Sequence, residues 1–117
     1  TVPLAIDAAT ELIMEHEVFC EIVVLGSLLP LDLDPVLESV ERTGALIVAE
    51  EGTMTAGIGA EIAARVQEAA WDDLRAPVRR VAAADGIIPS APGLEDAMLP
   101  SVSELVNAAL RCEAARV

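Results

Sequence analysis

The sequence contains no lysine and no tyrosine, and it has one histidine, one phenylalanine and one tryptophan. Without lysine it cannot form a Schiff base or supply the lysine of a phosphate-binding P-loop. One histidine and two distant cysteines, Cys20 and Cys112, do not make the clustered ligand set that a metal ion needs. The shortage of aromatic residues means that the core must be aliphatic, built from Leu, Ile, Val and Ala.

Positive charge and long hydrophobic runs are also scarce. Seven basic residues, all Arg, stand against 20 acidic ones, so the net charge is -13. This balance argues against nucleic acid or an anionic membrane as a partner, and it favours either simple solubility or a basic protein partner. No apolar run approaches the roughly 18 residues that span a bilayer. The two distant cysteines fit a reduced cytosolic setting, and we expect a cytoplasmic protein, or one of the mitochondrial matrix if the source is eukaryotic.

Two helices are predicted in the first half of the chain. Residues 2–15 repeat apolar side chains at helical spacing. The second helix is expected to start with Asp34 as N-cap and Pro35 at its first position, and Gly44 is well placed to end it.

Two more helices are predicted in the second half. One follows the glycine-bearing loop and extends to about Ala70, with apolar residues at helical spacing. The last one begins with Ser101 and Glu104 in the spacing of a capping box. Its expected buried face is Val102, Leu105, Val106 and Ala109.

Three short apolar runs, residues 20–25, 45–50 and 77–82, are predicted to be strands. A connection rich in Pro and Gly, without predicted structure, covers residues 85–100. Strands that alternate with helices predict an α/β domain with three layers, α/β/α, around a mostly parallel sheet. We expect residues 1–117 to form one such domain, because no linker or repeat divides them.

The loop after residues 45–50 is similar to a dinucleotide-binding turn but departs from it. Gly57 and Gly59 occupy the first two glycine positions of that turn, whereas Ile62 stands at the third. The carboxylates of Glu50 and Glu51 would also repel a phosphate. We expect the glycines to let the start of the helix pack closely on a neighbour, with a weak anion site as the alternative. The interface or anion-site candidates are Glu50, Glu51, Gly57, Gly59 and Glu61.

No catalytic residue is predicted in this chain. His16 is expected to lie at a helix end without a nucleophile nearby, and Ser27 lacks the flanking pattern of a nucleophile elbow. The carboxylate pairs Asp32/Asp34 and Asp72/Asp73 fall at predicted element boundaries. Capping and solvation explain them without acid–base catalysis.

Several stretches together resemble the C-terminal domain of the transketolase family. They are SLLPLD from Ser27, EEG from Glu50, GIGAEI from Gly57, IPSAP from Ile88, LED from Leu94 and LPS from Leu99. Their order extends over nearly the whole chain, and the closing segment is similar to the beta subunit of pyruvate and branched-chain 2-oxo acid dehydrogenases. The chain departs from the usual family pattern at Leu25-Gly26, at Ser90, and at Ala56, which replaces one residue of a common Gly-Gly pair.

The resemblance implies a role in a larger enzyme. That enzyme uses thiamine diphosphate and magnesium to decarboxylate a 2-oxo acid and passes the acyl group to a lipoyl arm. Two other domains hold the cofactor and substrate, so this domain is expected to bind neither the cofactor nor a metal. Its implied partners are the alpha subunit and a second beta subunit. In some complexes the domain also docks the basic subunit-binding domain of the dihydrolipoyl acyltransferase, with which the net charge of -13 is compatible.

The resemblance further implies a five-stranded mixed sheet whose first two strands precede residues 2–15. One of those strands is central, so we expect these residues to belong to a longer chain or to a sheet that another chain completes. Two other functions stay open. One is a transketolase-like enzyme part of specialised metabolism that loads a carrier protein. The other is a freestanding α/β module that binds an anion at the helix start of Gly57 and Gly59.

Overall fold

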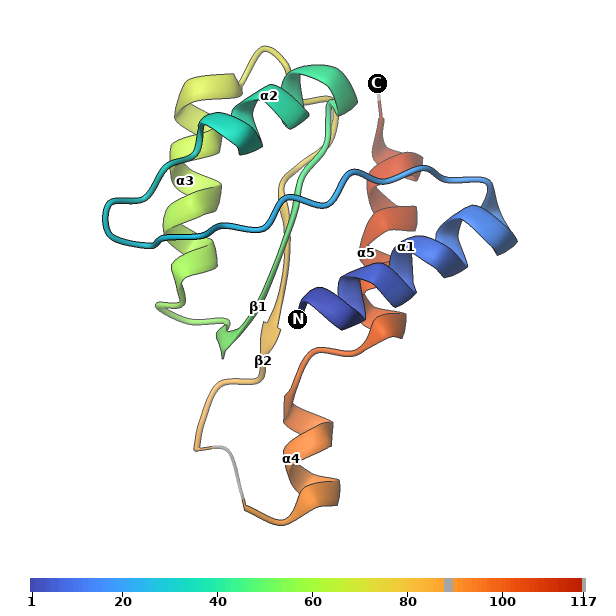
Figure 1. Ribbon diagram of the computed structural model, residues 1–117, viewed down its shortest axis with the longest axis vertical. Helices are drawn as coiled ribbons and strands as arrows, with labels where there is room; N and C mark the ends of the chain where they lie inside the picture. The colour runs from blue at the N-terminus through green and yellow to red at the C-terminus, as the bar shows by residue number, and fades with distance from the viewer. Residues whose placement is uncertain (88–89, 117) are drawn as a thin grey trace.

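Helices flank a short parallel sheet in the computed structural model of the protein, which describes residues 1–87 and 90–116 (Figure 1). The elements of this part of the chain are α1 (Val2–His16), α2 (Asp34–Thr43), β1 (Ile47–Thr53), α3 (Ile58–Ala70), β2 (Arg79–Ala83), α4 (Pro92–Met98) and α5 (Val102–Ala115). The α/β class predicted from the alternation of elements is confirmed.

The sheet consists of β1 and β2, which pair in parallel. Ile47 is opposite Arg79 and Ala49 is opposite Val81, and the register shifts before Thr53. The strands follow the predicted apolar runs at 45–50 and 77–82, each displaced by a few residues toward the C-terminus. Parallel pairing agrees with the non-alternating apolar character of the first run, because parallel strands are buried on both faces.

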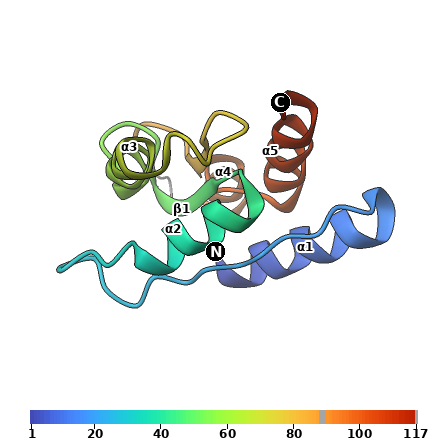
Figure 2. The ribbon, with the colours of Figure 1, turned by 90° about the horizontal axis from the view of Figure 1, so that it is seen from above.

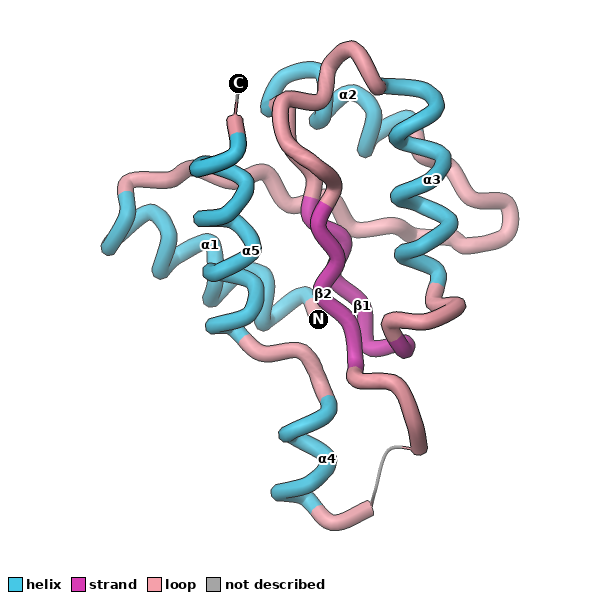
Figure 3. Tube along the Cα trace, turned by 180° about the vertical axis from the view of Figure 1, so that it is seen from behind, coloured by secondary structure: helices cyan, strands magenta, loops and turns pink. Residues whose placement is uncertain are grey.

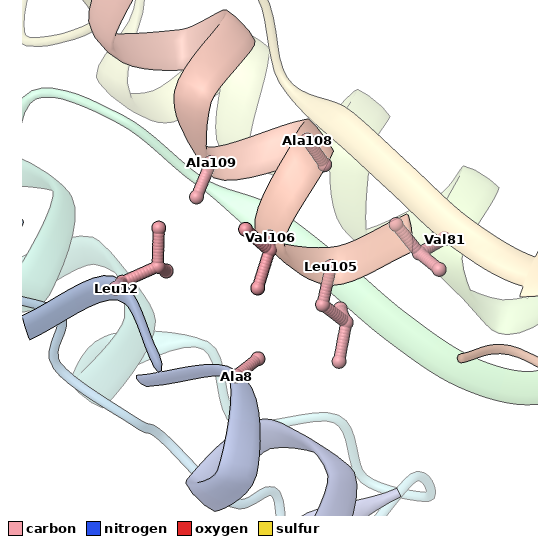
Figure 4. Packing of buried hydrophobic residues seen from close by; sticks show 7 residues of the cluster. All are labelled: Ala8, Leu12, Val81, Leu105, Val106, Ala108 and Ala109. Carbon is pink, nitrogen blue, oxygen red and sulfur yellow. The ribbon is translucent and has the colours of Figure 1, made fainter. Parts of the chain in front are cut away.

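Two apolar clusters, one on each face of the sheet, form the core. On one face α1 and α5 pack together and onto the sheet, as Figure 4 shows for Ala8, Leu12, Val81, Leu105, Val106, Ala108 and Ala109. On the other face α2 and α3 pack against β1 through Leu33, Val36, Val40, Val48, Ile62, Val66 and Ala70. Figure 3 shows the strands between these two helix pairs. The predicted three layers are therefore present.

The helix ends show which local sequence signals were sufficient to predict where a helix begins or ends. Gly44 ends α2 in the left-handed conformation with φ 74°, and Ser101 and Glu104 form both hydrogen bonds of the capping box before α5, as predicted. The prediction that Asp34 caps α2 is wrong, because Asp34 is the first helical residue. The side chain of Asp32 accepts the hydrogen bond from the Asp34 amide, at 3.0 Å.

Two predicted segments differ from the structure. Residues 20–25, expected to be a strand, are extended but have no ladder partner in the described part of the chain, and a strand without a partner gains no ladder hydrogen bonds. The connection 85–100 contains the helix α4, which is too short for its periodicity to be recognised. Ile88 and Pro89, part of one family-like stretch, lie outside the described residues.

Candidate functional site

The residues predicted around the glycine-bearing loop lie at the carboxyl end of β1 and the start of α3. Glu50 is in β1, Gly57 is the N-cap of α3, and Gly59 lies in its first turn. The Gly59 amide donates a hydrogen bond of 2.9 Å to Oε1 of Glu50, whose side chain is only 11% exposed. A side-chain carboxylate therefore occupies the helix start, where an anionic ligand would otherwise bind.

The position of this carboxylate explains both glycines. A Cβ atom at Gly57 would collide with the carbonyl oxygen of Thr53 and with Glu50. A Cβ atom at Gly59 would lie 2.7 Å from Oε1 of Glu50 and 3.3 Å from Val48. The glycines thus permit close packing of the helix start on β1, which is the geometry that we expected for them. Binding of an external anion at this helix start stays a prediction.

Arg80, a residue of β2, contacts the same Glu50 carboxylate. Its Nη2 lies 3.6 Å from Oε1 of Glu50 and donates a hydrogen bond to the carbonyl oxygen of Met54. Its side chain is 21% exposed, so solvent screens this ion pair only in part. Through Glu50 and Arg80 the two strands and α3 are held in one arrangement, which we call the Glu50 corner.

Glu51 and Glu61, the remaining loop candidates, do not join the Glu50 corner. The carboxylate of Glu51 is 3.3 Å from the amino nitrogen of Thr1, and its side chain is 64% exposed. Glu61 pairs with Arg65 one helical turn further along α3. The structure therefore brings together Glu50, Gly57 and Gly59, and leaves the two other glutamates on the surface.

Two polar contacts were not recognised in the sequence. Asp85, two residues after the end of β2, accepts hydrogen bonds from the amide and hydroxyl of Thr55, which follows β1. These bonds lower the pKa of the Asp85 carboxyl. The carboxyl ends of parallel strands meet at one edge of a sheet, so the place of Asp85 just after a strand was the available signal.

The second unrecognised contact attaches the extended segment to α2. Glu21 accepts hydrogen bonds from Arg42 at 2.9 and 3.0 Å and from the Ser39 hydroxyl at 2.6 Å. The Arg42 contact, followed by that of Ser39, lowers the pKa of Glu21 to about 2. Since these partners are 18 and 21 residues away in the chain, no local pattern could reveal them.

A cleft of about 590 Å³ lies beside β1, bounded by the helices and by residues 18–25. Cys20 and Cys112 both line it. Burial raises the pKa of both thiols, with further contributions from the neighbouring Glu113. A raised pKa keeps a thiol protonated and weakly nucleophilic. Cys112 is also buried and has the character of a structural residue, whereas Cys20 is exposed at the cleft.

The remaining candidates do not form a catalytic or metal centre in residues 1–87 and 90–116. His16 is the last residue of α1, and Asp72 and Asp73 are exposed in the turn after α3. Within this part of the chain no group of three or more His, Cys, Asp or Glu side chains is arranged to hold a metal ion. None of its helices combines the length and apolar character required to cross a membrane.

The α/β arrangement of these helices and strands agrees with comparison to known proteins. The family model of the transketolase C-terminal domain matches residues 1–105. The chain therefore belongs to the transketolase C-terminal domain family.

Its relatives include subunits of multi-component enzymes. The pyruvate dehydrogenase E1 component subunit beta of Rickettsia bellii is 46% identical over 107 residues, which are 92% of this chain and 33% of that protein. The mitochondrial counterpart of Dictyostelium discoideum is 37% identical over 88% of this chain and 29% of its own length. The acetoin:2,6-dichlorophenolindophenol oxidoreductase subunit beta of Cupriavidus necator is 40% identical over 90% of this chain and 31% of its own length. The chain thus spans about a third of the length of these relatives.

Proposed function

We propose that this chain is the C-terminal assembly domain of the beta subunit of a thiamine diphosphate-dependent 2-oxo acid dehydrogenase of the pyruvate dehydrogenase type. The observation that carries the proposal is the 46% identity to the Rickettsia bellii E1 beta subunit over 92% of the chain. The whole enzyme would decarboxylate a 2-oxo acid and transfer the acyl group to a lipoyl carrier. Thiamine diphosphate and magnesium would bind to its other domains, and this domain would contribute no catalytic residue.

In this role the Glu50 corner acts as a structural support. It fixes the start of α3 against β1 and leaves the carboxylates of Glu51 and Glu61 exposed. These two side chains are our candidates for contacts with the alpha subunit and the second beta subunit. The intact enzyme would reside in the bacterial cytoplasm or, in a eukaryote, in the mitochondrial matrix; the Dictyostelium relative is named as mitochondrial.

A basic subunit-binding domain of a dihydrolipoyl acyltransferase is the further partner that we propose. The net charge of -13 supports it, because electrostatic complementarity between an acidic and a basic surface accelerates and orients association. Salt screens such attraction, with a Debye length of about 10 Å at 0.1 M ionic strength. The proposed interaction is therefore expected to weaken as salt is added.

Calorimetry on the intact beta subunit, assembled with its alpha subunit, tests this partner. We expect the isolated basic domain to bind, and its affinity to fall at least about tenfold between about 50 and about 500 mM salt. A lipoyl domain serves as the control and should not bind at this site. Absence of binding, or binding that is independent of salt, would contradict the proposed docking.

An oxidoreductase that acts on acetoin is the second candidate, favoured by the relative from Cupriavidus necator. The intact enzyme can be assayed with pyruvate or acetoin, using 2,6-dichlorophenolindophenol as electron acceptor. The first proposal predicts reduction of the dye with a 2-oxo acid. Reduction with acetoin alone would instead establish the second candidate.

A further inference from the structure

The edge of β2 that faces away from β1 is open. The Arg79 amide donates a hydrogen bond to the Leu46 carbonyl, so the backbone groups of Arg79 point toward β1. Because successive residues of a strand point their backbone groups to opposite edges, those of Val78, Arg80 and Ala82 point away from β1. These outward groups have no hydrogen-bond partner among the described residues. Figure 2 shows α3 and α5 on one side of the molecule, opposite the extended segment that precedes α2.

The chain itself uses this outer edge just after β2. The Ala84 amide donates a hydrogen bond of 2.8 Å to the carbonyl of Met98, the last residue of α4. Ala84 follows Ala82 by two residues, so its amide points to the same edge. The outer edge therefore accepts a backbone partner where the chain supplies one, and the stretch before it, residues 78–82, has none within the part of the chain that the structure describes.

A groove of about 510 Å³ follows this unpaired stretch, between β2 and α5. Figure 3 shows α5 beside the two strands. The α5 wall of the groove is one stripe at helical spacing, formed by Glu104, Asn107, Ala108 and Arg111. An extended segment in the groove would pair with the backbone of β2 and lie against this stripe.

The groove is basic, unlike the chain as a whole. Three of the seven arginines line it, Arg79, Arg80 and Arg111, together with one acidic residue, Glu104. The Glu104 carboxylate accepts a hydrogen bond from the Ser101 amide and so belongs to the capping box of α5. The groove thus concentrates positive charge on a chain whose net charge is -13.

Arg79 and Arg111 carry charges that no acidic side chain balances. Neither forms an ion pair with any residue that the structure describes. Nε of Arg79 is buried and lacks a hydrogen-bond partner among those residues, which is costly for a charged donor. Arg79 stands two residues before Val81, whose side chain packs with α5, so both side chains lie on the α5 face of β2. A ligand with a carboxylate on that face would balance both arginines.

The same arginines disfavour a second copy of the chain as the partner. Two β2 edges that paired with each other would bring Arg79 and Arg80 of both copies close together. Like charges that face one another across a ladder are destabilising, and charged side chains on an edge strand prevent self-association. An acidic strand meets no such repulsion, and its carboxylates would accept charge-assisted hydrogen bonds from the guanidinium groups.

We propose that the groove binds an extended acidic segment of another protein, which joins the outer edge of β2 as an additional strand. The backbone of the segment pairs with Val78, Arg80 and Ala82, and one of its acidic side chains lies between Arg79 and Arg111. In this mode of recognition the main-chain hydrogen bonds supply affinity, and the side chains at alternate positions supply selectivity. Acidic residues at every second position of the segment all fall on the α5 face.

Fluorescence anisotropy on the intact, full-length protein tests the segment. The probe is a labelled peptide of about seven residues in which valine alternates with aspartate, at about 0.15 M salt, where a Debye length of about 8 Å screens the distant acidic residues. One control peptide has asparagine in place of every aspartate. A second keeps the aspartates and has proline at two neighbouring positions, so that a ladder donor is lost in either register. We expect the acidic peptide to bind at least about tenfold more tightly than either control.

Two variants of the protein locate the bound peptide. Arg111 is exposed on α5, so Arg111→Gln should fold normally, with an unchanged melting temperature, and bind the acidic peptide at least about fivefold more weakly. Arg65→Gln is the matched control, because it removes an exposed positive charge from α3, outside the groove. It should change the affinity by less than about twofold.

Amide hydrogen exchange reports the ladder directly. With the acidic peptide at saturation, exchange at Val78, Arg80 and Ala82 should slow at least about tenfold. The amides of Arg79 and Val81 face β1 already, and their exchange should change less than about twofold. This alternation distinguishes a strand added at the edge from a general stabilisation of the domain.

Four outcomes would overturn the proposal. The first is equal affinity of the aspartate and asparagine peptides, or no binding at about 1 mM peptide. The second is an equal loss of affinity in both arginine variants, which would place the peptide elsewhere. The third is peptide binding without the alternating protection. The fourth is protection of the outward amides in the intact protein without peptide, which would show that a subunit or a second copy covers the edge. No catalytic activity is measured and the ligand is acidic, so the result is independent of the docking test with a basic domain.

Discussion

The two edges of β1 differ in how their surroundings are completed. On one edge β1 pairs with β2, and the Glu50 corner connects both strands to α3. On the other edge lies the cleft, and the segment beyond it leaves Phe19 81% and Val24 61% exposed. The comparison shows that β1 forms ladder hydrogen bonds on the edge where β2 lies and forms none with the segment across the cleft in the described part of the chain.

The difference has a physical cause in the kind of contact that each edge needs. The Glu50 corner requires one carboxylate, two small residues and one guanidinium, and all of them are supplied within residues 50–80. The cleft edge requires a whole strand with its row of donors and acceptors. Substitutions on the two edges should therefore have unequal effects.

The largest expected effect is at Glu50. Glu50→Ala removes the acceptor of the Gly59 amide and leaves Arg80 partly buried without its carboxylate. We expect a loss of about 3 kcal/mol in the free energy of unfolding, measured in urea. The adjacent Glu51→Ala is the matched control and should change it by less than about 0.5 kcal/mol, because that side chain is exposed. Similar losses in both variants would contradict a special role for the corner.

A slightly smaller loss is expected at Gly57. Gly57→Ala places a methyl group against the Thr53 carbonyl, a backbone atom that cannot move freely. Overpacking of this kind costs about 2 to 3 kcal/mol at its upper end. Gly26→Ala, next to the cleft, meets no atom within 4 Å and should be nearly neutral. The melting temperatures of the two variants test this difference. An unchanged melting temperature in Gly57→Ala would show that the Glu50 corner can shift to accommodate the methyl group.

Replacing a valine by alanine on each side of β1 should show how tightly the side chains of that side are packed. Val66 in α3 is fully buried, so Val66→Ala should cost about 2 kcal/mol. Val24→Ala should cost less than about 0.5 kcal/mol, since Val24 is exposed. Both values come from urea unfolding curves. Equal costs at Val24 and Val66 would contradict this difference in packing.

A stabilising substitution is expected in the loop between β1 and α3. Ala56 has φ 60°, in the left-handed region that favours glycine. An alanine there costs roughly 1 kcal/mol or more relative to glycine, so Ala56→Gly should raise the unfolding free energy by about 1 kcal/mol. Ala60→Gly, inside α3, is the opposing control and should lower it by a similar amount. Calorimetric melting temperatures should move in opposite directions.

The smallest effect concerns Glu21, which attaches the cleft segment to α2. Its pKa is lowered from 4.5 to about 2 by the hydrogen bonds from Arg42 and Ser39. A carboxyl with a lowered pKa in the folded state stabilises it above the unfolded pKa, and this stabilisation is lost as the pH falls from about 4.5 toward 2. The carboxyl carbon of Glu21 should titrate by NMR near 2, and near its ordinary value in Arg42→Gln. Equal titration midpoints would contradict the contact.

The helices were largely predictable, because their signals are local. Periodic apolar residues, the αL glycine at Gly44 and the capping box at Ser101 all act within a few residues of the chain. The same applies to the apolar run of β1, whose β-branched residues identify a buried strand. The short helix α4 was not predicted, since a seven-residue segment offers too few turns for a periodic pattern.

The candidate site was predictable in part. The sequence drew attention to Gly57 and Gly59, but it could not show that the atom they accommodate is Oε1 of Glu50. Nor could it pair Asp85 with Thr55 across 30 residues. Contacts of that kind depend on the parallel register of β1 and β2, which brings the two strand ends together.

By itself the sequence determined the composition of the core, the four longer helices and the family resemblance, because each depends on residues that are near one another or on ordered motifs. Only the tertiary structure decided that Glu50 holds the start of α3 against β1, and that residues 20–25 form no ladder within the part of the chain that the structure describes. The physical reason is that a strand is completed by its neighbour. Its own residues supply the propensity to be extended, and the ladder comes from a second strand placed beside it.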